Sequence, residues 1–435
     1  MKIEKIRLKN FKVFQDVTIE NIPAFCVIVG ANGAGKTTLF DVFGFLKDCL
    51  TYNVTRALQA RGGFQEVVSR GHENENIELE IQYRLPLTGT ERLVTYLVEI
   101  GLHNKRPAVV REVLRYKRGT YGSPYQFLKF AYGKGEAVTN EEDFSKTDEE
   151  LNREEQDLGA VDILAIKFAY GKGEAVTNEE DFSKTAEELS REEQDLGAVD
   201  ILAIKGLGQF QKFKAANALR QMIESWHVSD FHIDAARGAK EAVGEYEHLS
   251  ASGDNLHQVA LNLFENHRDV YERILEAMRQ RVPGVNQITT QDTVDGRLVL
   301  QFGNGIFKDP FIDRFVSDGT LKMFAYLVLL HDPRPHPFLC VEEPENQLYP
   351  RLLPELAEEF RTYSRKGGQV MVSTHSPDFL NATEVGEVFW LEKGDNGFSK
   401  VCRAADDAQV VAYMEEGDKM GYLWNQGLFG KADPQ

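Results

Sequence analysis

The segment Gly30–Thr37 has the clearest chemical meaning in the sequence, because it matches G-x-x-x-x-G-K-[ST] at every fixed position. Glycines let a backbone curl until its N–H groups point at phosphate oxygens, and a helix that follows adds the positive end of its dipole. In such a loop the ammonium group of Lys36 pairs with the β- and γ-phosphates, and the hydroxyl group of Thr37 binds Mg²⁺. The apolar run CVIVG before the segment and the helical run TTLFDVFGFL after it fit this context. The sequence therefore predicts a phosphate-binding loop.

Two adjacent carboxylates, Glu342 and Glu343, end the apolar run FLCV and precede Pro344. A phosphate-binding loop needs a partner acid at the end of a second buried strand, which holds Mg²⁺ through water, and the next acid polarises the attacking water. The pair could be surface charge alone, but four apolar residues before it favour a strand terminus. We therefore expect Glu342 on the magnesium side and Glu343 as the base.

Two later segments add groups that suit a phosphate. Ser317 and Gly319 precede an apolar helix, so a hydroxyl group and backbone N–H groups meet at a helix N-terminus. His375 follows a buried strand, where it can reach a γ-phosphate. Alone, such a serine is more often a simple cap and such a histidine more often structural. Their order and spacing after the phosphate-binding loop favour a nucleotide site.

Apolar periodicity predicts the elements that position these residues. Residues 2–30 and 77–118 alternate as short strands, and the second range is typical of an antiparallel sheet. Residues 206–226 and 255–281 have helical periodicity. From residue 319 onward, helices alternate with the apolar strands FLCVEE and QVMVSTHS, which indicates a parallel sheet covered on both faces.

Four segments in chain order resemble the motifs of ABC-type ATPase heads: GANGAGKT resembles Walker A, VSDGT the signature, FLCVEEPENQLYP the Walker B motif and D-loop, and VSTHS the His switch. The opening MKIEKIRLKNFKVFQ is similar to that of the RecF, SMC and OLD branch. More narrowly, the chain resembles compact bacterial AAA-family ATPases, many of which lie in anti-phage or mobile-element loci. The resemblance implies an α/β fold: a P-loop ABC-ATPase head with a mixed or parallel sheet core, an antiparallel β lobe and a helical insertion.

The resemblance also implies a role for each matching residue. Glu342 is the Mg²⁺-side acid, Glu343 the catalytic base and His375 the switch histidine. Ser317 and Gly319 contact the γ-phosphate of the nucleotide held by the opposite subunit of a homodimer. A Q-loop glutamine that helps to bind the metal is expected after the first helix, and Gln65 is the candidate. The ATP-binding residues are Gly30, Asn32, Gly33, Gly35, Lys36, Thr37 and Thr38.

Three positions depart from the family pattern. Glu342 stands where Asp is usual, so the metal must lie farther from the strand and slow hydrolysis is expected. Val316 replaces the usual signature leucine, and Tyr349-Pro350 stands where the branch often has His-Pro. Only 60 residues follow His375, too few for the Toprim nuclease domain of OLD proteins, so we expect any nuclease to be a separate polypeptide.

A tandem duplication divides the chain. Residues 129–166 and 167–204 differ at two positions, Asp148 against Ala186 and Asn152 against Ser190. The sequence predicts four parts: residues 1–128, an N-terminal ATPase lobe with Walker A and the antiparallel sheet; 129–204, the duplication; 205–295, a helical subdomain; and 296–435, a C-terminal ATPase lobe with signature, Walker B and His switch.

Each copy is predicted to form a hairpin around Gly-Lys-Gly and then a short acidic helix, which in copy one opens with the capping box Thr147-x-x-Glu150 and ends at Gly159. The copies carry net charges of −7 and −6, out of −18 for the chain. They could form an acidic arm that binds a partner, but a solvated insertion with a redundant copy is favoured.

Composition excludes several classes. There is no apolar leader at the N-terminus, no apolar run long enough for a spanning helix, and the four cysteines are scattered. We therefore expect a cytoplasmic protein without a membrane partner. The aromatic tail at residues 420–429 could dock a partner, although packing on its own core is favoured.

Three functions compete. The first is an ATP-hydrolysing dimerisation switch that needs ATP and Mg²⁺ and drives a separate DNA-related or phage-defence effector. The second is a RecF-like repair ATPase that binds DNA, and the third is a non-hydrolysing scaffold, which the intact Lys36, Glu343 and His375 disfavour. The basic stretch at residues 103–118 has a net charge of +5 and could line a DNA path, or it could protect a sheet edge.

Overall fold

The computed structural model describes residues 2–87, 90–117, 124–139, 164–169, 172–177, 191–229, 231–238, 240–241 and 246–432. They form two compact units that exchange segments along the chain. The first unit takes residues 1–22, 41–226 and 393–401, and the second takes residues 23–40, 227–392 and 402–435. The four parts expected from the sequence stay a prediction.

The second unit is built on a parallel sheet. Its strand order is β12-β17-β18-β3-β19-β20, and the neighbouring strands from β12 to β19 pair in parallel. Every residue of β3 and β18 is buried, as expected for central strands covered on both faces. The bounds are β3 (Phe25–Gly30), β12 (His227–Ser229), β17 (Phe338–Glu342), β18 (Gln369–Ser373), β19 (Val388–Lys393) and β20 (Ser399–Arg403).

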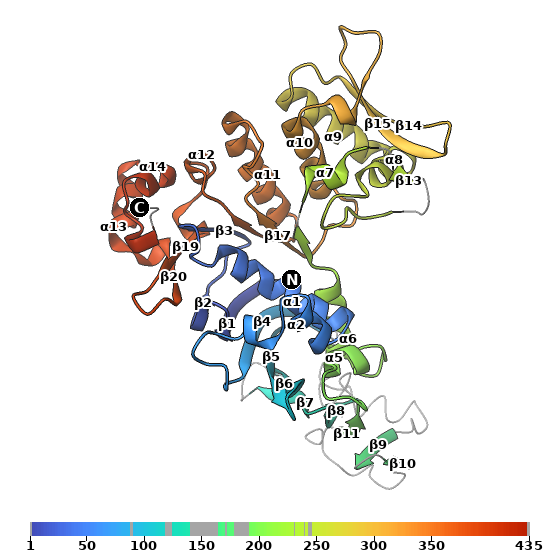
Figure 1. Cartoon of the computed structure of the whole chain (residues 1–435), viewed down its shortest axis with the longest axis vertical. Helices are drawn as coiled ribbons and strands as arrows, with labels where there is room; N and C mark the ends of the chain where they lie inside the picture. Colours follow the sequence, from blue (N-terminus) through green and yellow to red (C-terminus); the bar gives the residue numbers. More distant parts are fainter. Residues whose placement is uncertain are drawn as a thin grey trace, which may run out of the picture. The chain divides into compact units, whose positions relative to one another are not determined.

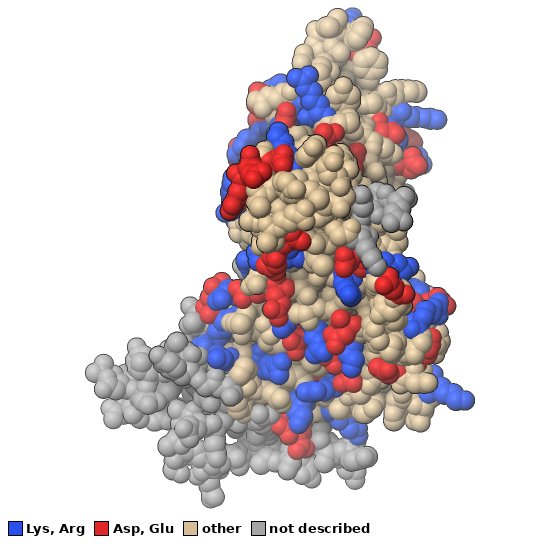
Figure 2. Space-filling model, turned by 90° about the vertical axis from the view of Figure 1, so that its left-hand side faces the viewer, with Lys and Arg blue, Asp and Glu red and all other residues tan. Residues whose placement is uncertain are grey.

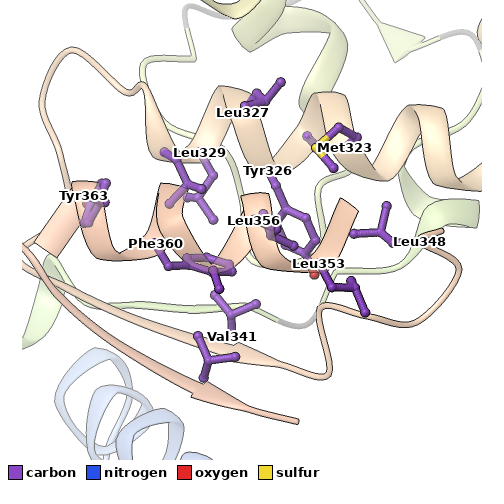
Figure 3. Packing of buried hydrophobic residues seen from close by; sticks show 14 of the residues in the cluster. Met323, Tyr326, Leu327, Leu329, Val341, Leu348, Leu353, Leu356, Phe360 and Tyr363 are labelled. Carbon is purple, nitrogen blue, oxygen red and sulfur yellow. The ribbon is translucent and has the colours of Figure 1, made fainter. Parts of the chain in front are cut away.

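Helices cover this sheet, as Figure 1 shows. Tyr326 of α10 and Phe360 of α11 are buried, and their rings meet edge to face with centroids 6.0 Å apart. Figure 3 shows these rings and Leu356 packed above Val341 of β17. The helices of the unit are α7 (Ile233–Ala236), α8 (Leu256–Asn266), α9 (Arg268–Arg281), α10 (Asp318–Leu330), α11 (Leu353–Arg365), α12 (Pro377–Leu380), α13 (Ala408–Glu416) and α14 (Met420–Asn425).

A small antiparallel sheet in the same unit precedes the signature segment. In it, β15 (Arg297–Gly303) pairs with β13 (Lys240–Glu241), β14 (Gln287–Asp292) and β16 (Phe311–Ile312). At the other end of the unit, Trp424 and Phe429 are buried and their rings lie 5.6 Å apart. The expectation that the aromatic tail packs on its own core is confirmed.

The first unit is an antiparallel sheet with the order β11-β8-β7-β6-β5-β4-β1-β2. Buried and less buried residues alternate along β4, so one face packs on a core. Its strands are β1 (Lys2–Phe11), β2 (Phe14–Glu20), β4 (Ile77–Leu87), β5 (Thr90–His103), β6 (Arg106–Tyr116), β7 (Tyr125–Ala131), β8 (Lys134–Val138) and β11 (Arg191–Asp195). Its helices are most of α1 (Lys36–Thr51), α2 (Val54–Gln59), α3 (Phe64–Val67), α5 (Ala203–Leu207) and α6 (Lys214–Glu224). The predicted α/β class, with a parallel core, an antiparallel sheet and added helices, is confirmed.

The interpretation of residues 103–118 as an edge is wrong, because β5 and β6 lie inside the sheet between β4 and β7. Arg115 of this stretch forms an ion pair of 3.1 Å with Glu80 on β4. Glu112 is fully buried. Figure 2 shows basic and acidic side chains interspersed over one face, with no broad area of one sign among the residues drawn in colour. Strand protection therefore does not explain the charges, and Arg115 faces an acidic neighbour.

The duplication is used in an unexpected way. Strand β8 and the last three residues of β7 come from copy one, but the next neighbour of β8, β11, comes from copy two. The corresponding hairpin, β9 (Leu164–Ala169) with β10 (Lys172–Thr177), spans the junction of the two copies and forms a separate two-stranded sheet. The two predicted hairpins are thus present, and the sheet joins the first half of one copy to the second half of the other.

The acidic helix predicted for copy two is wrong over residues 191–195, which form a strand. Pairing with β8 supplies ladder hydrogen bonds, and Asp195 forms an ion pair of 3.2 Å with Lys134, so tertiary pairing overrides local helix propensity. Gly197 has a φ of 70° and donates its N–H to Asp195 Oδ1, which ends the strand. In copy one, Thr147, Glu150 and Gly159 lie outside the described residues. Among the described helices, none is long and apolar enough to cross a membrane.

Candidate nucleotide site

The predicted phosphate-binding loop connects β3 to α1, as the sequence pattern requires. Gly33 and Gly35 have φ angles of 79° and 103°, which side chains rarely adopt. A Cβ on Gly30 would lie 2.8 Å from the carbonyl oxygen of Leu391, whereas one on Gly33 would meet nothing within 4 Å. Glycine at position 30 thus allows close strand packing, and Gly33 leaves the outer side of the loop open.

Lys36 is buried beneath this loop. Its Nζ donates hydrogen bonds to the carbonyl oxygens of Gly30, at 2.8 Å, and Ala31, at 3.2 Å. Burial lowers the pKa of Lys36, and the carboxylates of Glu343, Glu345 and Glu342 oppose that change. The ammonium group therefore lies between the loop backbone and three acids.

The strand order brings the other candidates to the same edge. Because β17, β18 and β3 are adjacent and parallel, their carboxyl ends meet, and Glu342, Ser373 and Ile28 are in register. Thr37 Oγ1 donates a hydrogen bond of 2.7 Å to Glu342 Oε2. A hydroxyl group and a carboxylate from opposite ends of the chain thus form an all-oxygen pair, and the longer side chain of Glu in place of Asp still reaches Thr37.

Glu343 is held in an unusual conformation. Its φ is 42°, in the left-handed region, and its N–H donates to the carbonyl oxygen of Ser373 at 2.9 Å. Its two carboxylate oxygens have different partners: Oε1 lies 3.0 Å from Nε2 of His375, and Oε2 accepts a bond of 2.9 Å from Nδ2 of Asn346. About a third of each side chain of the Glu343–His375 pair is exposed. The carboxylate is therefore oriented on both sides and still reaches solvent.

Glu345 and Lys322 belong to this site and were missed by sequence reasoning. Glu345 Oε1 accepts hydrogen bonds from Thr374 Oγ1, at 2.7 Å, and from the backbone N–H of His375, at 2.6 Å. Lys322 of α10 donates from Nζ to the carbonyl oxygen of Asn346 at 2.8 Å, and burial lowers its pKa to about 8. Glu345 lies within the Walker B motif and could have been found there, but nothing local to Lys322 shows where its side chain goes.

The signature segment is fixed to the same loop. Ser317 is exposed, caps α10 by accepting the N–H of Thr320 at 3.3 Å, and lies 2.8 Å from the Thr320 hydroxyl oxygen. A Cβ on Gly319 would lie 2.7 Å from the carbonyl oxygen of Gln347, so only glycine allows this close approach. Arg237 donates to the carbonyl oxygens of Asp313, at 2.6 Å, and Val316, at 2.8 Å, and pairs with Asp318. Arg237 had no signal in the sequence.

The remaining predicted residues lie as follows. Asn32 is exposed in the loop between β3 and α1, and Thr38 is half-buried in the first turn of α1. Gln65 is exposed on α3, which belongs to the other compact unit, so its role as the Q-loop glutamine stays a prediction. The structure thus gathers Lys36, Thr37 and the residues of three later motifs in one unit, and their roles remain predictions.

Comparison with known proteins identifies the family. Residues 1–227 match the family model described as "AAA ATPase domain", and residues 175–381 match one described as "AAA domain, putative AbiEii toxin, Type IV TA system". The first match spans more than half of the chain, so the chain belongs to the AAA ATPase domain family.

Individual proteins are similar to this chain over part or most of its length. The Old nuclease of Escherichia phage P2 is 24% identical over 184 residues, a match that covers 35% of this chain and 30% of that protein. An SMC head solved bound to the C-winged helix domain of ScpA has a TM-score of 0.50 at 14% identity and covers 92% of this chain and 97% of that one. The Pyrococcus furiosus SMC head, solved with an extended coiled coil and bound to the C-terminal domain of ScpA, has a TM-score of 0.47 at 15% identity, with coverage of 95% and 99%. The chain has the fold of an ABC-type ATPase head of the SMC and OLD type.

Proposed function

We propose that this chain hydrolyses ATP to ADP and phosphate and uses the reaction as a dimerisation switch. The observation that carries the proposal is the pairing of Thr37 with Glu342 beside a Glu343 carboxylate oriented by His375 and Asn346. A scaffold that only binds nucleotide has no need for a carboxylate positioned on both oxygens.

The residues present suit ATP and Mg²⁺. The open side of the loop at Gly33 leaves its backbone accessible to phosphate oxygens, and Lys36 supplies a cation beneath the loop. Thr37 and Glu342 offer hydroxyl and carboxylate oxygens, which are the ligands that Mg²⁺ prefers. Bound there, Mg²⁺ neutralises charge on the phosphate oxygens and orients them.

Glu343 would act as the general base. Its carboxylate would accept a proton from the attacking water, while the contact of Oε1 with His375 Nε2 fixes one oxygen. Asn346 Nδ2 fixes the other oxygen, and the partly exposed carboxylate remains within reach of water. A positioned general base contributes about 10²–10⁴-fold to a rate.

The switch follows from the signature segment. Ser317 is exposed on the same unit as the loop but serves the γ-phosphate of a second copy, so two chains would enclose two nucleotides. The output would go to a separately encoded effector in DNA metabolism or phage defence. The matches to a toxin–antitoxin AAA domain and to a phage nuclease support this class of output. Among the described residues, the ion pair of Arg115 on β6 with Glu80 offsets one of the basic charges there and gives no support to a DNA path.

The test is Glu343→Gln. We expect this variant to bind ATP with parental affinity, to hydrolyse it at least 100-fold more slowly and to accumulate as a dimer, because the cleavage that releases the sandwich fails. Light scattering after size-exclusion chromatography, with and without ATP and Mg²⁺, measures the mass. Glu415→Gln, an exposed change on α13, is the matched control and should behave like the parent. A Glu343→Gln chain that stays monomeric at saturating ATP would contradict the proposal of an ATP-bound dimer. An unchanged hydrolysis rate would contradict the role of Glu343 as the general base.

A further inference from the structure

A second group of ligating side chains lies at the opposite edge of the parallel sheet. The segment His331–Pro337, with the sequence HDPRPHP, leads from α10 into the amino end of β17, whereas Glu342 stands at the carboxyl end of the same strand. His248, from the loop before α8, meets this segment. Among the residues that the structure describes, His248, Asp332 and His336 form the one group of three His, Cys, Asp or Glu side chains whose ligand atoms all lie within 4.8 Å of one another.

The three side chains contact each other directly. Nδ1 of His248 lies 2.6 Å from Oδ2 of Asp332. The ring of His336 lies 4.9 Å from that of His248 and 5.0 Å from that of His227, measured between centroids. His227 at the start of β12 thus supports the ring of His336 from another direction, and two imidazoles and a carboxylate converge on one point.

Both loops that carry these residues are held in place. The hydroxyl group of Tyr363 donates to the carbonyl oxygen of His336 at 2.6 Å, and prolines flank His336 on both sides. The amide of Asn255, itself buried, donates to the carbonyl oxygen of His248 at 2.9 Å. The backbone N–H of Arg334 donates to Oδ1 of Asp332 at 2.8 Å. These bonds fix the ligand set before any ion arrives, which lowers the entropic cost of binding.

The exposure of the group leaves room for an ion and its water. Only 5% of the Asp332 side chain is exposed, against 38% for His248. Asp332 also lines a polar cavity of about 250 Å³ with Asn262, Asn266 and His267. Burial fixes the carboxylate, and the exposed part of His248 leaves the group accessible to an ion from solvent.

We propose that His248, Asp332 and His336 bind a divalent first-row transition metal ion, with Zn²⁺ the best fit. Imidazole nitrogens with one carboxylate are typical ligands of Zn²⁺, whereas Mg²⁺ takes oxygen ligands, so this site and the nucleotide site select different ions. In a tetrahedral zinc site with bonds of about 2.0–2.2 Å, ligand atoms lie about 3.4 Å apart. The group must therefore contract by at most about 1.4 Å, while the contact between His248 and Asp332 opens by about 0.8 Å. The ion would clamp the loop before α8 to the segment that joins the signature helix to the Walker B strand.

Zinc titration of the full chain, freed of metal by a chelator and followed by calorimetry without nucleotide, tests the site. We expect one Zn²⁺ per chain at micromolar affinity or better. Loss of a ligand in His336→Gln or His248→Gln should weaken binding at least about tenfold, since even indirect supports of metal ligands contribute 10–100-fold. His232→Gln, an exposed histidine of the same unit, is the matched control and should keep parental affinity.

Co²⁺ absorption and thermal unfolding give independent readouts. Bound Co²⁺ should show the intense visible bands of a low-symmetry site in the parent, and these should fade in His336→Gln. Zn²⁺ should raise the melting temperature of the parent but not that of His248→Gln. Because the His248 side chain is partly exposed, we expect this variant to fold without metal. Absence of one-to-one binding in the parent, or equal losses in His232→Gln and His336→Gln, would show that the group is only a hydrogen-bonded cluster. ATP hydrolysis plays no part in these measurements, so the proposed function and the metal site can fail separately.

Discussion

Removal of one copy of the duplication should leave the protein folded and slightly more stable. The sheet of the first unit uses β8 from copy one and β11 from copy two, and 52 residues connect Val138 to Arg191. Deletion of residues 167–204 removes 38 residues and leaves a connection of 14, because copy one supplies an identical REEQD segment at residues 153–157. Every strand and hydrogen bond of the larger sheet can therefore form again.

The size of the effect follows from loop closure. Closure entropy grows as (3/2)RT ln n, so shortening the connection from 52 to 14 residues favours folding by about 1 kcal/mol. The deletion also removes the hairpin β9–β10, which lies beside β11 but shares no ladder with the larger sheet, so we expect its loss to cost less than the shorter connection gains. The expected gain corresponds to a rise of about 2–4 °C in the melting temperature of a unit of this size.

A second deletion provides the control. Removing residues 139–176 keeps the tail of copy two, and the product differs from the first deletion only at the two positions that distinguish the copies. Both shortened chains should have a urea unfolding midpoint at or above that of the parent. Both should also hydrolyse ATP at the parental rate. If either is destabilised by more than about 2 kcal/mol, the looped segment has a structural role that closure entropy ignores, and the reasoning fails.

Three further predictions concern single side chains. Lys36→Ala should abolish ATP binding measured by calorimetry, because the lysine neutralises phosphate charge that backbone N–H groups alone do not. Ser317→Arg should keep ATP binding but stop hydrolysis, and mixing it with Lys36→Ala should restore partial activity, since one composite site of the mixed dimer carries neither change. Glu112, buried where it accepts the N–H groups of Ala203 and Ile204, has a pKa raised by burial to about 7. The native state therefore holds a proton that the unfolded chain releases above pH 4.5, and urea unfolding should show the parent losing up to about 3 kcal/mol relative to Glu112→Gln as pH rises from 4.5 to 7.

Each of these has a clear contrary result. Parental nucleotide affinity in Lys36→Ala would show that the loop does not hold the phosphates. Mixed dimers that form but remain inactive would argue against sites shared between subunits. A difference between parent and Glu112→Gln that does not change with pH would show that the buried carboxyl group is not the titrating residue.

Local patterns were enough to predict the loop, the strands and the acids that follow them. A phosphate-binding loop depends on residues close in sequence. An apolar run that ends in Glu342 and Glu343 likewise predicts a buried strand with acids at its end from local sequence alone. Partners fixed by distant backbone were not predictable. In the sequence, Lys322 is an ordinary helix residue, and only the packing of α10 brings its Nζ to the carbonyl oxygen of Asn346. Arg237 likewise contacts the carbonyl oxygen of Val316 in the signature segment only in the folded chain. The prediction of a helix over residues 191–195 was wrong for the same reason, because these residues pair with β8, which is distant in sequence.

The contacts of α10 suggest how one nucleotide site would sense the other. Ser317 caps this helix, Gly319 touches the carbonyl oxygen of Gln347, and Lys322 binds that of Asn346. Asn346 in turn donates to Glu343, so an unbroken path of direct contacts runs from the signature serine to the base of the same chain. A γ-phosphate of the partner that draws Ser317 forward must therefore move the loop that orients Glu343. In the proposed dimer, filling one active site would then favour the active arrangement of the other without being required for it, so a mixed dimer with one intact composite site keeps part of the activity, as expected of two coupled sites.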